Sequence, residues 1–151
     1  MVAIMGIADA ASFYLIRHAE KQTGDDPELT VQGQQRAQRI AHLLSLTNSD
    51  AIYSTNYQRT RQTAEPIAQV KSLTVQHYNP KELKQFAHKL LSDNKDAVIV
   101  GHSNTTPQLV RLLSGQSVPD MDEQTYYKIY QVVTFPDVEG QPAVVNVLNS
   151  D

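Results

Sequence analysis

The 151-residue sequence predicts a single-domain, three-layer α/β/α sandwich around a mostly parallel central sheet. Short apolar runs alternate with segments whose apolar residues recur at the helical period, which is typical of βαβ units. The 40% hydrophobic content includes no run near the roughly 20 apolar residues of a membrane span. Towards the end of the chain, two β-rich runs over residues 126–135 and 143–148 predict a strand pair that extends the sheet, in antiparallel fashion.

The first half of the chain predicts three strands and two helices. Residues 13–17 are the first buried strand, and Thr30 is the expected N-cap of a helix over residues 31–46. A strand over residues 50–53, a helix over about 57–70 and a strand over 73–75 follow. The side chains expected to face the core from the two helices are Ala37, Ile40, Ala41, Leu43 and Leu44, and then Ala64, Ile67 and Ala68.

The next helix is the one with the clearest periodicity. Asn79 is its expected cap and Pro80 its first helical residue, because proline has no N–H to lose at that position. A buried strand over residues 97–100 follows, then a helix over 107–114 whose end is marked by Gly115. The inward residues of the helix after Pro80 are expected to be Leu83, Phe86, Ala87, Leu90 and Leu91.

Charge and cysteine content exclude several classes of function. The 13 basic and 16 acidic side chains include no cluster of lysines or arginines, which argues against binding to nucleic acid or to a membrane surface. The chain has no cysteine, so disulfides, thiolate catalysis and cysteine-based metal sites are excluded. A cysteine-free chain works in oxidising and reducing media alike, so the cysteine content does not identify the cellular compartment.

Residues 1–11 (MVAIMGIADAA) are interpreted as a leader to a single domain that spans residues 1–151. The leader is apolar and ends in small residues, but it lacks the basic start of a secretory signal. A disordered or packed leader is therefore favoured over a signal remnant. We take a cytoplasmic location as the default, and export to the periplasm as the alternative if residues 1–11 are such a remnant.

Two histidines and an arginine lie where predicted strands end. Arg17 and His18 close the strand over residues 13–17, and His102 follows the strand over 97–100. The carboxyl ends of parallel strands meet at one edge of a sheet, where ligands bind, so these side chains should share a crevice. Arginine does not bind metals, but its planar guanidinium suits phosphate and carboxylate oxygens. The pattern predicts an oxyanion site rather than a metal site.

The strand over residues 50–53 adds a second arginine to this edge. It leads into a hydroxyl-rich turn and then Arg59, near the start of a predicted helix. Free N–H groups and the positive dipole end of a helix N-terminus also attract anions. Two arginines, two histidines and a helix end therefore predict a pocket for a dianion.

Four segments of the chain carry motifs that resemble those of a known family. They are residues 15–20 (LIRHAE), 29–37 (LTVQGQQRA), 53–64 (YSTNYQRTRQTA) and 100–104 (VGHSN). In this order they resemble the R-H-G, L-T-x-x-G-x-x-Q-A, Y-S-S-x-x-x-R-A-x-Q-T-A and G-H-S motifs of the histidine phosphatase superfamily, which has the phosphoglycerate-mutase-like fold. The short chain is similar to the small phosphohistidine phosphatases of that superfamily. Four motifs in order over residues 13–113 are a specific signal.

The resemblance implies a role for each matching residue. His18 would accept the phosphoryl group, and Arg17, Arg59 and His102 would clamp it, with no metal or other cofactor. Arg59 rather than Arg61 falls at the arginine of the third motif. A neutral imidazole can attack phosphorus in line while the partners stabilise the equatorial oxygens. The residues expected to neighbour the phosphate or substrate are Glu20, Thr55, Ser103 and Asn104.

The proton donor does not carry over from the family pattern. Larger members place a carboxylic acid beyond the third strand to protonate the leaving oxygen. Here Glu82 is the nearest carboxyl, but in the first turn of a helix it is as easily a surface residue that compensates the helix dipole. The small phosphohistidine phosphatases are similar in having no obvious donor, which favours phosphohistidine or aryl phosphates over alkyl phosphates.

The sequence therefore predicts a metal-independent phosphatase that works through a phosphohistidine intermediate. Its partner would be a phosphoprotein or a small phosphomonoester. The first alternative is a mutase-type phosphotransferase, whose relatives carry long insertions that this chain lacks. The second is a non-catalytic phospho-ligand binding module, expected to have lost one of the four core residues. A metal-binding protein is the weakest alternative.

Overall fold

The computed structural model describes residues 10–151 and builds them around one six-stranded sheet. The strand order is β3-β2-β4-β1-β5-β6. The first four strands in this order are parallel, whereas β5 runs antiparallel to β1 and β6 antiparallel to β5. The strands are β1 (Ala11–Arg17), β2 (Ala51–Ser54), β3 (Val75–His77), β4 (Ala97–Gly101), β5 (Lys128–Thr134) and β6 (Val144–Asn149).

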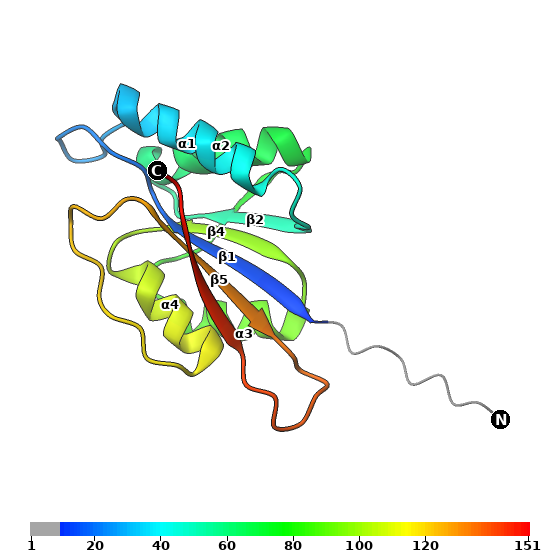
Figure 1. Cartoon of the computed structure of the whole chain (residues 1–151). Coiled ribbons are helices and arrows are strands. Elements are labelled where there is room, and N and C mark those ends of the chain that lie inside the picture. The colour runs from blue at the N-terminus through cyan, green and yellow to red at the C-terminus, as the bar shows by residue number, and fades with distance from the viewer. Residues whose placement is uncertain (1–9) are drawn as a thin grey trace.

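Helices cover both faces of the sheet, as the three-layer prediction requires (Figure 1). Two of them, α1 and α2, lie side by side on one face, and the other two lie on the opposite face. Parallel strands need crossover connections, and α1, α2 and α3 supply those between β1, β2, β3 and β4, whereas α4 leads from β4 to the antiparallel β5. The helices are α1 (Val31–Leu44), α2 (Gln58–Lys71), α3 (Leu83–Asp93) and α4 (Thr105–Ser114).

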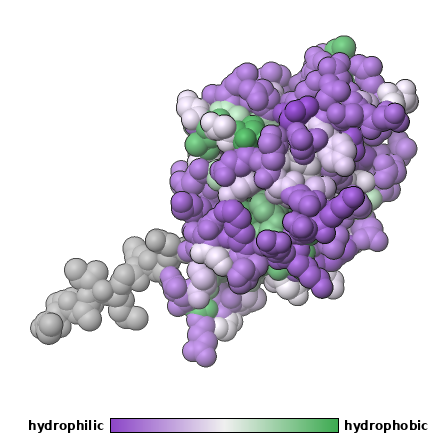
Figure 2. All heavy atoms as spheres, turned by 180° about the vertical axis from the view of Figure 1, so that it is seen from behind, coloured by the Kyte–Doolittle hydropathy of each residue, from purple (hydrophilic) through white to green (hydrophobic). Residues whose placement is uncertain are grey.

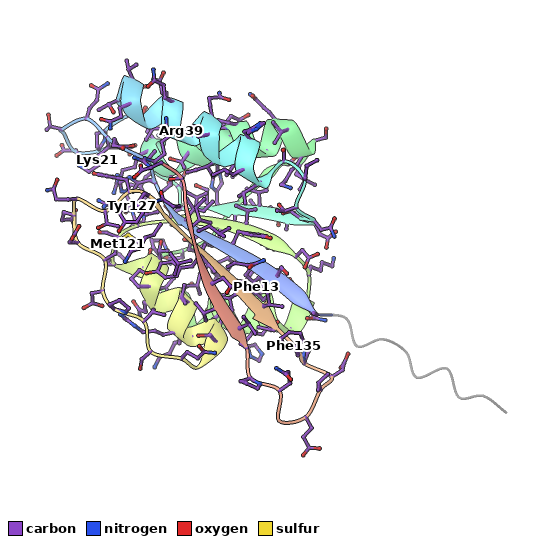
Figure 3. The ribbon with its side chains drawn as sticks, in the orientation of Figure 1. Phe13, Lys21, Arg39, Met121, Tyr127 and Phe135 are labelled. Carbon is purple, nitrogen blue, oxygen red and sulfur yellow. The ribbon has the colours of Figure 1, made fainter. Side chains whose placement is uncertain are left out.

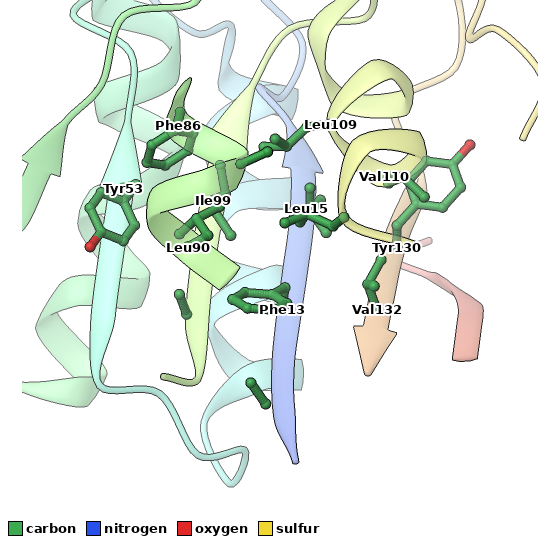
Figure 4. Packing of buried hydrophobic residues seen from close by; sticks show 14 of the residues in the cluster. Phe13, Leu15, Tyr53, Phe86, Leu90, Ile99, Leu109, Val110, Tyr130 and Val132 are labelled. Carbon is green, nitrogen blue, oxygen red and sulfur yellow. The ribbon is translucent and has the colours of Figure 1, made fainter. Parts of the chain in front are cut away.

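Each face of the sheet has its own apolar core. Phe13 and Leu15 of β1 pack with α3 and α4 in the larger core, which Figure 4 shows at close range. The neighbouring residues Tyr14 and Ile16 point to the other face and pack with α1 and α2. Burial on both faces explains why the sequence of β1 is continuously apolar rather than alternating.

The first helix begins as predicted and ends earlier. Thr30 is its N-cap, and the Thr30 hydroxyl accepts a hydrogen bond from the Gly33 N–H. The helix stops at Leu44 rather than at residue 46. Leu43, expected in the core, is 50% exposed because it lies about 100° around the helix from the buried Leu44.

The segment between β2 and β4 differs most from its prediction. The third strand covers Val75–His77 instead of residues 73–75, and the helix after it begins at Leu83. Asn79 does act as a cap, but of a turn, because its Oδ1 accepts from the Lys81 N–H. Asn79 and Pro80 therefore form a turn before the helix, and Pro80 is not its first residue. Leu91, also expected in the core, is 39% exposed.

The part of the chain after α4 agrees with its prediction, whereas the predicted leader agrees only in part. The final two strands are antiparallel, and Gly115 ends α4 in the left-handed conformation, with a φ of 69°. Residues 1–9 of the predicted leader lie outside the described residues. Ala11, assigned to the leader, is instead fully buried at the start of β1, so the first strand begins two residues before Phe13.

The face of the molecule seen from behind is largely hydrophilic (Figure 2). Figure 2 shows one face as mainly polar with separate apolar spots, such as those expected from single exposed side chains. Over residues 10–151, none of the helices combines the length and the apolar character needed to cross a bilayer.

A close contact at Gly33 joins the start of α1 to the loop after β1. A methyl group added at Gly33 would overlap the backbone carbonyl oxygen of Glu20. That backbone is held in place, because the Thr30 N–H donates to the same oxygen and the Glu20 carboxylate is paired with Arg36. The loop that begins with His18 therefore depends on the absence of a side chain at residue 33.

We expect Gly33→Ala to destabilise the protein by about 1–3 kcal/mol, because a well-packed position cannot admit an extra carbon without strain. Helix propensity alone predicts the opposite, a gain of about 1 kcal/mol on exchanging glycine for alanine. Urea unfolding measures the change, with the exposed Gln35→Ala as the control. A stabilised Gly33→Ala variant would show that the contact with Glu20 is not tight.

Candidate active site

The ends of β1, β2 and β4 bring the predicted site residues to one edge of the sheet. Arg17 pairs with Gly101 in the β1–β4 register, and the His18 N–H donates to the Gly101 carbonyl oxygen. His18 and His102 line a cavity of about 380 Å³ at this edge. Lys21, which lines the same cavity, marks this end of the molecule in Figure 3, whereas Phe135 lies at the other end.

His18 lies at the base of this cavity as a neutral imidazole. Its side chain is 3% exposed, and its Nδ1 is 2.8 Å from the Ala19 carbonyl oxygen. A carbonyl only accepts hydrogen bonds, so Nδ1 carries the proton and Nε2 carries the unshared electron pair. Burial, followed by the charges of Arg17 and Arg59 and the proximity of His102, lowers the pKa of His18 to about 3.

His102 lies between Arg59 on one side of its ring and a chain of two hydroxyl groups on the other. Its Nδ1 lies 3.4 Å from Arg59 Nη2, and because guanidinium only donates, Nδ1 accepts and Nε2 carries the proton. Nε2 is 2.9 Å from Thr55 Oγ1, which in turn donates to Thr60 Oγ1. Burial and the two site arginines lower the pKa of His102 to about 4. The His18 and His102 rings lie 5.7 Å apart, edge to face.

Arg17 is buried beside the cavity and holds the loop between α4 and β5. Its Nη1 donates to the backbone carbonyl oxygens of Asp122, Glu123 and Thr125 at 2.9–3.2 Å. Its Nη2 is 3.4 Å from Glu123 Oε2, and its guanidinium stacks 4.0 Å from the Tyr126 ring centre. The buried Nε of Arg17 has no hydrogen-bond partner. Arg17 is therefore both a loop anchor and a source of donors that are not all used.

Arg59 enters the cavity from the first turn of α2. Its guanidinium lies 4.7 Å from the Tyr57 ring centre, with Nη1 3.9 Å from Asp26 Oδ1. Its Nε, like that of Arg17, is buried and without a partner. Buried donors are costly unless they bond to something, and two unpaired guanidinium N–H groups at one edge of a sheet suit an oxyanion.

The structure separates the other predicted neighbours of the phosphate. Ser103 and Asn104 line the cavity, and the Ser103 hydroxyl donates to Glu123 Oε1 at 3.0 Å. Thr55 is fully buried and contacts His102 rather than the cavity. Glu20 points away, because Arg36 binds both of its carboxylate oxygens at 2.8–3.0 Å. The expectation that Glu20 lies near the phosphate is therefore not met.

Glu82, the expected candidate for the proton donor, also lies outside the cavity that holds His18. It lines a neighbouring hollow with Tyr78 and Phe86, whose rings stack at 4.2 Å. The turn at Asn79 places Pro80 and Lys81 at the cavity instead. The segment named from the sequence thus reaches the cavity, but Glu82 is not among the side chains that line it.

Several cavity residues were not found from the sequence. Lys21, Tyr57, Thr105 and Glu123 all line the cavity with His18. Tyr57 lies within the motif over residues 53–64 and Lys21 directly follows the motif over residues 15–20, so both could have been proposed from the sequence. Glu123 lies in a loop with no motif and reaches the site only because Arg17 binds the carbonyl groups around it. No local sequence signal marks such a long-range anchor.

Across residues 10–151, no group of three or more histidine, aspartate or glutamate side chains is arranged to hold a metal ion. The donors at the cavity are instead guanidinium, imidazole, hydroxyl and the N–H groups at the start of α4. Such donors bind the oxygens of phosphate groups.

Comparisons with known proteins agree with this geometry. Residues 13–83 match the model of the histidine phosphatase superfamily (branch 1). Phosphoserine phosphatase 1 of Hydrogenobacter thermophilus is 38% identical over 69 residues, which are 40% of this chain. That match spans 33% of the relative's own length.

Solved structures share the fold over nearly the whole chain. A mycobacterial glucosyl-3-phosphoglycerate phosphatase superposes with a TM-score of 0.77 at 14% identity, covering 94% of this chain and 100% of that one. The protein histidine phosphatase SixA, complexed with tungstate, gives 0.74 at 16% identity, covering 92% and 97%. At such identities these likenesses show a common fold, the phosphoglycerate-mutase-like fold predicted above.

The lowered pKa values of His18 and His102 predict a dependence of stability on pH. Unfolded histidines have a pKa of 6.5, whereas these two have values of about 3 and 4 in the folded protein. The unfolded state therefore takes up protons first, and stability is lost as the pH falls from 6.5 towards 4. Urea unfolding at pH 7.5 and 5.0 should show this loss. It should be smaller in the His18→Asn/His102→Asn variant, and an equal loss would contradict neutral site histidines.

Proposed function

We propose that the chain, whose residues 13–83 match the model of the histidine phosphatase superfamily, is a metal-independent phosphatase of that superfamily that forms a phosphohistidine intermediate on His18. The observation that carries the proposal is the state of His18. Burial lowers its pKa to about 3, which keeps the imidazole neutral, and its Nδ1–H is bonded to the Ala19 carbonyl oxygen, which leaves the unshared electron pair on Nε2. A nucleophile must have this pair free before it attacks phosphorus.

The first step transfers the phosphoryl group from the substrate to His18. Nε2 forms a bond to phosphorus, the bond from phosphorus to the leaving oxygen or nitrogen breaks, and the leaving atom takes up a proton. The imidazole becomes cationic, and the Ala19 carbonyl oxygen stabilises its Nδ1–H. In the second step water attacks phosphorus, the bond from Nε2 to phosphorus breaks, and phosphate leaves with neutral His18 restored.

Arg17, Arg59 and His102 are proposed to hold the transferred group. The Nε groups of both arginines are buried without a hydrogen-bond partner, and we propose that they donate to phosphoryl oxygens when substrate is bound. A bound dianion would also favour protonation of His102 at Nδ1, which now faces Arg59 Nη2, and so supply a further donor. Preorganised donors around the equatorial oxygens are the main source of catalysis in phosphoryl transfer.

The substrate is proposed to be a protein phosphohistidine or a small phosphomonoester. SixA supports the first by its fold, whereas phosphoserine phosphatase 1 and glucosyl-3-phosphoglycerate phosphatase support the second. The connections that lead into α2 and α4 at the site are short, residues 55–57 and 102–104. We propose that water therefore reaches the intermediate, which favours hydrolysis over the retention of phosphate that a mutase needs.

Turnover of an aryl phosphate in the presence of a chelator tests the proposed function. We expect steady hydrolysis that the chelator does not change, and His18→Ala should lower kcat by at least about a thousandfold, because no other group replaces the nucleophile. A native protein with no turnover, or with turnover that the chelator abolishes, would contradict the proposal. Circular dichroism checks that His18→Ala remains folded.

Arg59 and Arg61 offer a matched pair of arginines two residues apart. Arg59 lines the cavity, whereas Arg61 is exposed on α2. Lysine cannot reproduce the planar guanidinium, so Arg59→Lys should lower kcat/KM about tenfold or more for each charge-assisted bond lost. Arg61→Lys should change kcat/KM by less than about twofold. A larger loss in Arg61→Lys than in Arg59→Lys would show that the motif has been placed two residues out of register.

A further inference from the structure

We propose that Glu123 is the proton donor to the leaving group, the role for which Glu82 was the sequence candidate. This inference rests on the proposed phosphatase function and names a further catalytic residue for it. Glu123 is the one carboxyl side chain among the described residues that line the cavity with His18. The complete lining is His18, Lys21, Tyr57, Arg59, Pro80, Lys81, His102, Ser103, Asn104, Thr105 and Glu123.

The backbone of Glu123 is fixed relative to the nucleophile. Arg17, directly before His18, donates to the Glu123 carbonyl oxygen at 3.1 Å and to the carbonyl oxygens of Asp122 and Thr125. Met121, two residues before Glu123, is buried in the larger core. The loop therefore carries Glu123 at a set place beside the cavity although no helix or strand contains it.

The carboxylate of Glu123 contacts groups on both sides of the cavity. Its Oε2 is 3.4 Å from Arg17 Nη2, and its Oε1 accepts from the Ser103 hydroxyl at 3.0 Å. Arg17 is next to His18 in the chain, and Ser103 is next to His102. A phosphoryl group bound between the two histidines would thus lie within reach of this carboxyl.

His18 and Glu123 line the same cavity but differ greatly in exposure. His18 is 3% exposed at the base of the cavity, whereas the Glu123 side chain is 76% exposed at its mouth. In-line transfer puts the leaving atom on the far side of phosphorus from the attacking nitrogen. The leaving atom therefore departs toward solvent, on the side where Glu123 lies.

Proton balance favours a carboxyl for this role. A phosphoryl group that binds Arg17 competes with the Glu123 carboxylate for Nη2, which frees the carboxyl group to face the leaving atom. The carboxylic acid gives its proton to the leaving oxygen as the bond to phosphorus breaks. The resulting carboxylate then takes a proton from the water that attacks the phosphohistidine, which restores the acid. Lys21, Lys81 and Tyr57 also lie at the cavity, but ammonium and phenol groups are weaker acids than a carboxyl.

A series of substrates with leaving groups of graded acidity tests the proposal. The native protein should hydrolyse aryl and alkyl phosphates with a shallow dependence of kcat/KM on leaving-group acidity. Glu123→Gln keeps the shape and the amide oxygen for Ser103 but has no proton to give. It should retain aryl phosphate turnover within about threefold and lose at least about a hundredfold on an alkyl phosphate, as removal of a general acid does. Glu65→Gln, an exposed change on α2, is the charge-matched control.

The possible outcomes separate this inference from the proposed function. Equal loss on aryl and alkyl substrates in Glu123→Gln would assign Glu123 to loop structure, and higher activity on both would make its carboxylate a competitor of phosphate for Arg17. Either result overturns the inference, as does an alkyl-selective loss in Glu82→Gln instead. All three leave the function intact provided that the native protein still turns over aryl phosphate through His18. Absence of that turnover would refute the function itself.

Discussion

The hydrogen bond from His18 Nδ1 to the Ala19 carbonyl oxygen is the interaction on which the chemistry of this site depends. It places the ring proton on Nδ1 and leaves the unshared electron pair on Nε2, the proposed nucleophile. It is local, because donor and acceptor belong to adjacent residues, yet it needs a long-range frame. The His18 N–H is bonded to Gly101 at the end of β4, and the Ala19 N–H is bonded to the Thr63 hydroxyl in α2. The fold thus fixes both sides of the peptide that orients the nucleophile.

Burial and charge act on this imidazole in the same direction. Removal from water disfavours the cationic ring, and the nearby guanidinium groups disfavour it further. In the proposed mechanism the same guanidinium groups attract the phosphate dianion, so the features that keep His18 neutral would also bind its substrate. After transfer, the new negative charge on the phosphoryl group offsets the repulsion that the cationic ring would otherwise meet from Arg17 and Arg59. In the proposed mechanism, the charges of the arginines and of His18 are therefore compatible both before and after transfer of the phosphoryl group.

Much of this arrangement could be predicted from the sequence, and what could not has a physical cause. The strand ends at Arg17 and Gly101 follow from continuous apolar runs, and parallel strands bring such ends together by geometry alone. The Thr30 cap and the end of α4 at Gly115 follow from local chemistry as well. The turn at Asn79 and Pro80 does not, because the same residues favour both a turn and a helix start, and only packing decides between them.

Functional contacts were hardest to predict where they depend on distant partners. Glu20 was expected near the phosphate, but Arg36, sixteen residues away, takes its carboxylate. Thr55 was expected at the phosphate and instead contacts the far side of His102. Glu123 comes to the cavity through the bonds of Arg17 to its loop, which span more than a hundred residues of sequence. Spacing within a motif does not encode such contacts.

The site of phosphorylation on the protein is the most direct test of the central claim that neutral His18 attacks through Nε2. The enzyme would be quenched in alkali during turnover of an aryl phosphate, because phosphohistidine survives base. Peptide mapping would then locate the phosphate, and phosphorus NMR would distinguish the two ring nitrogens. The account predicts phosphate on His18 at Nε2. Phosphate on Nδ1 of His18, or on His102, would contradict it.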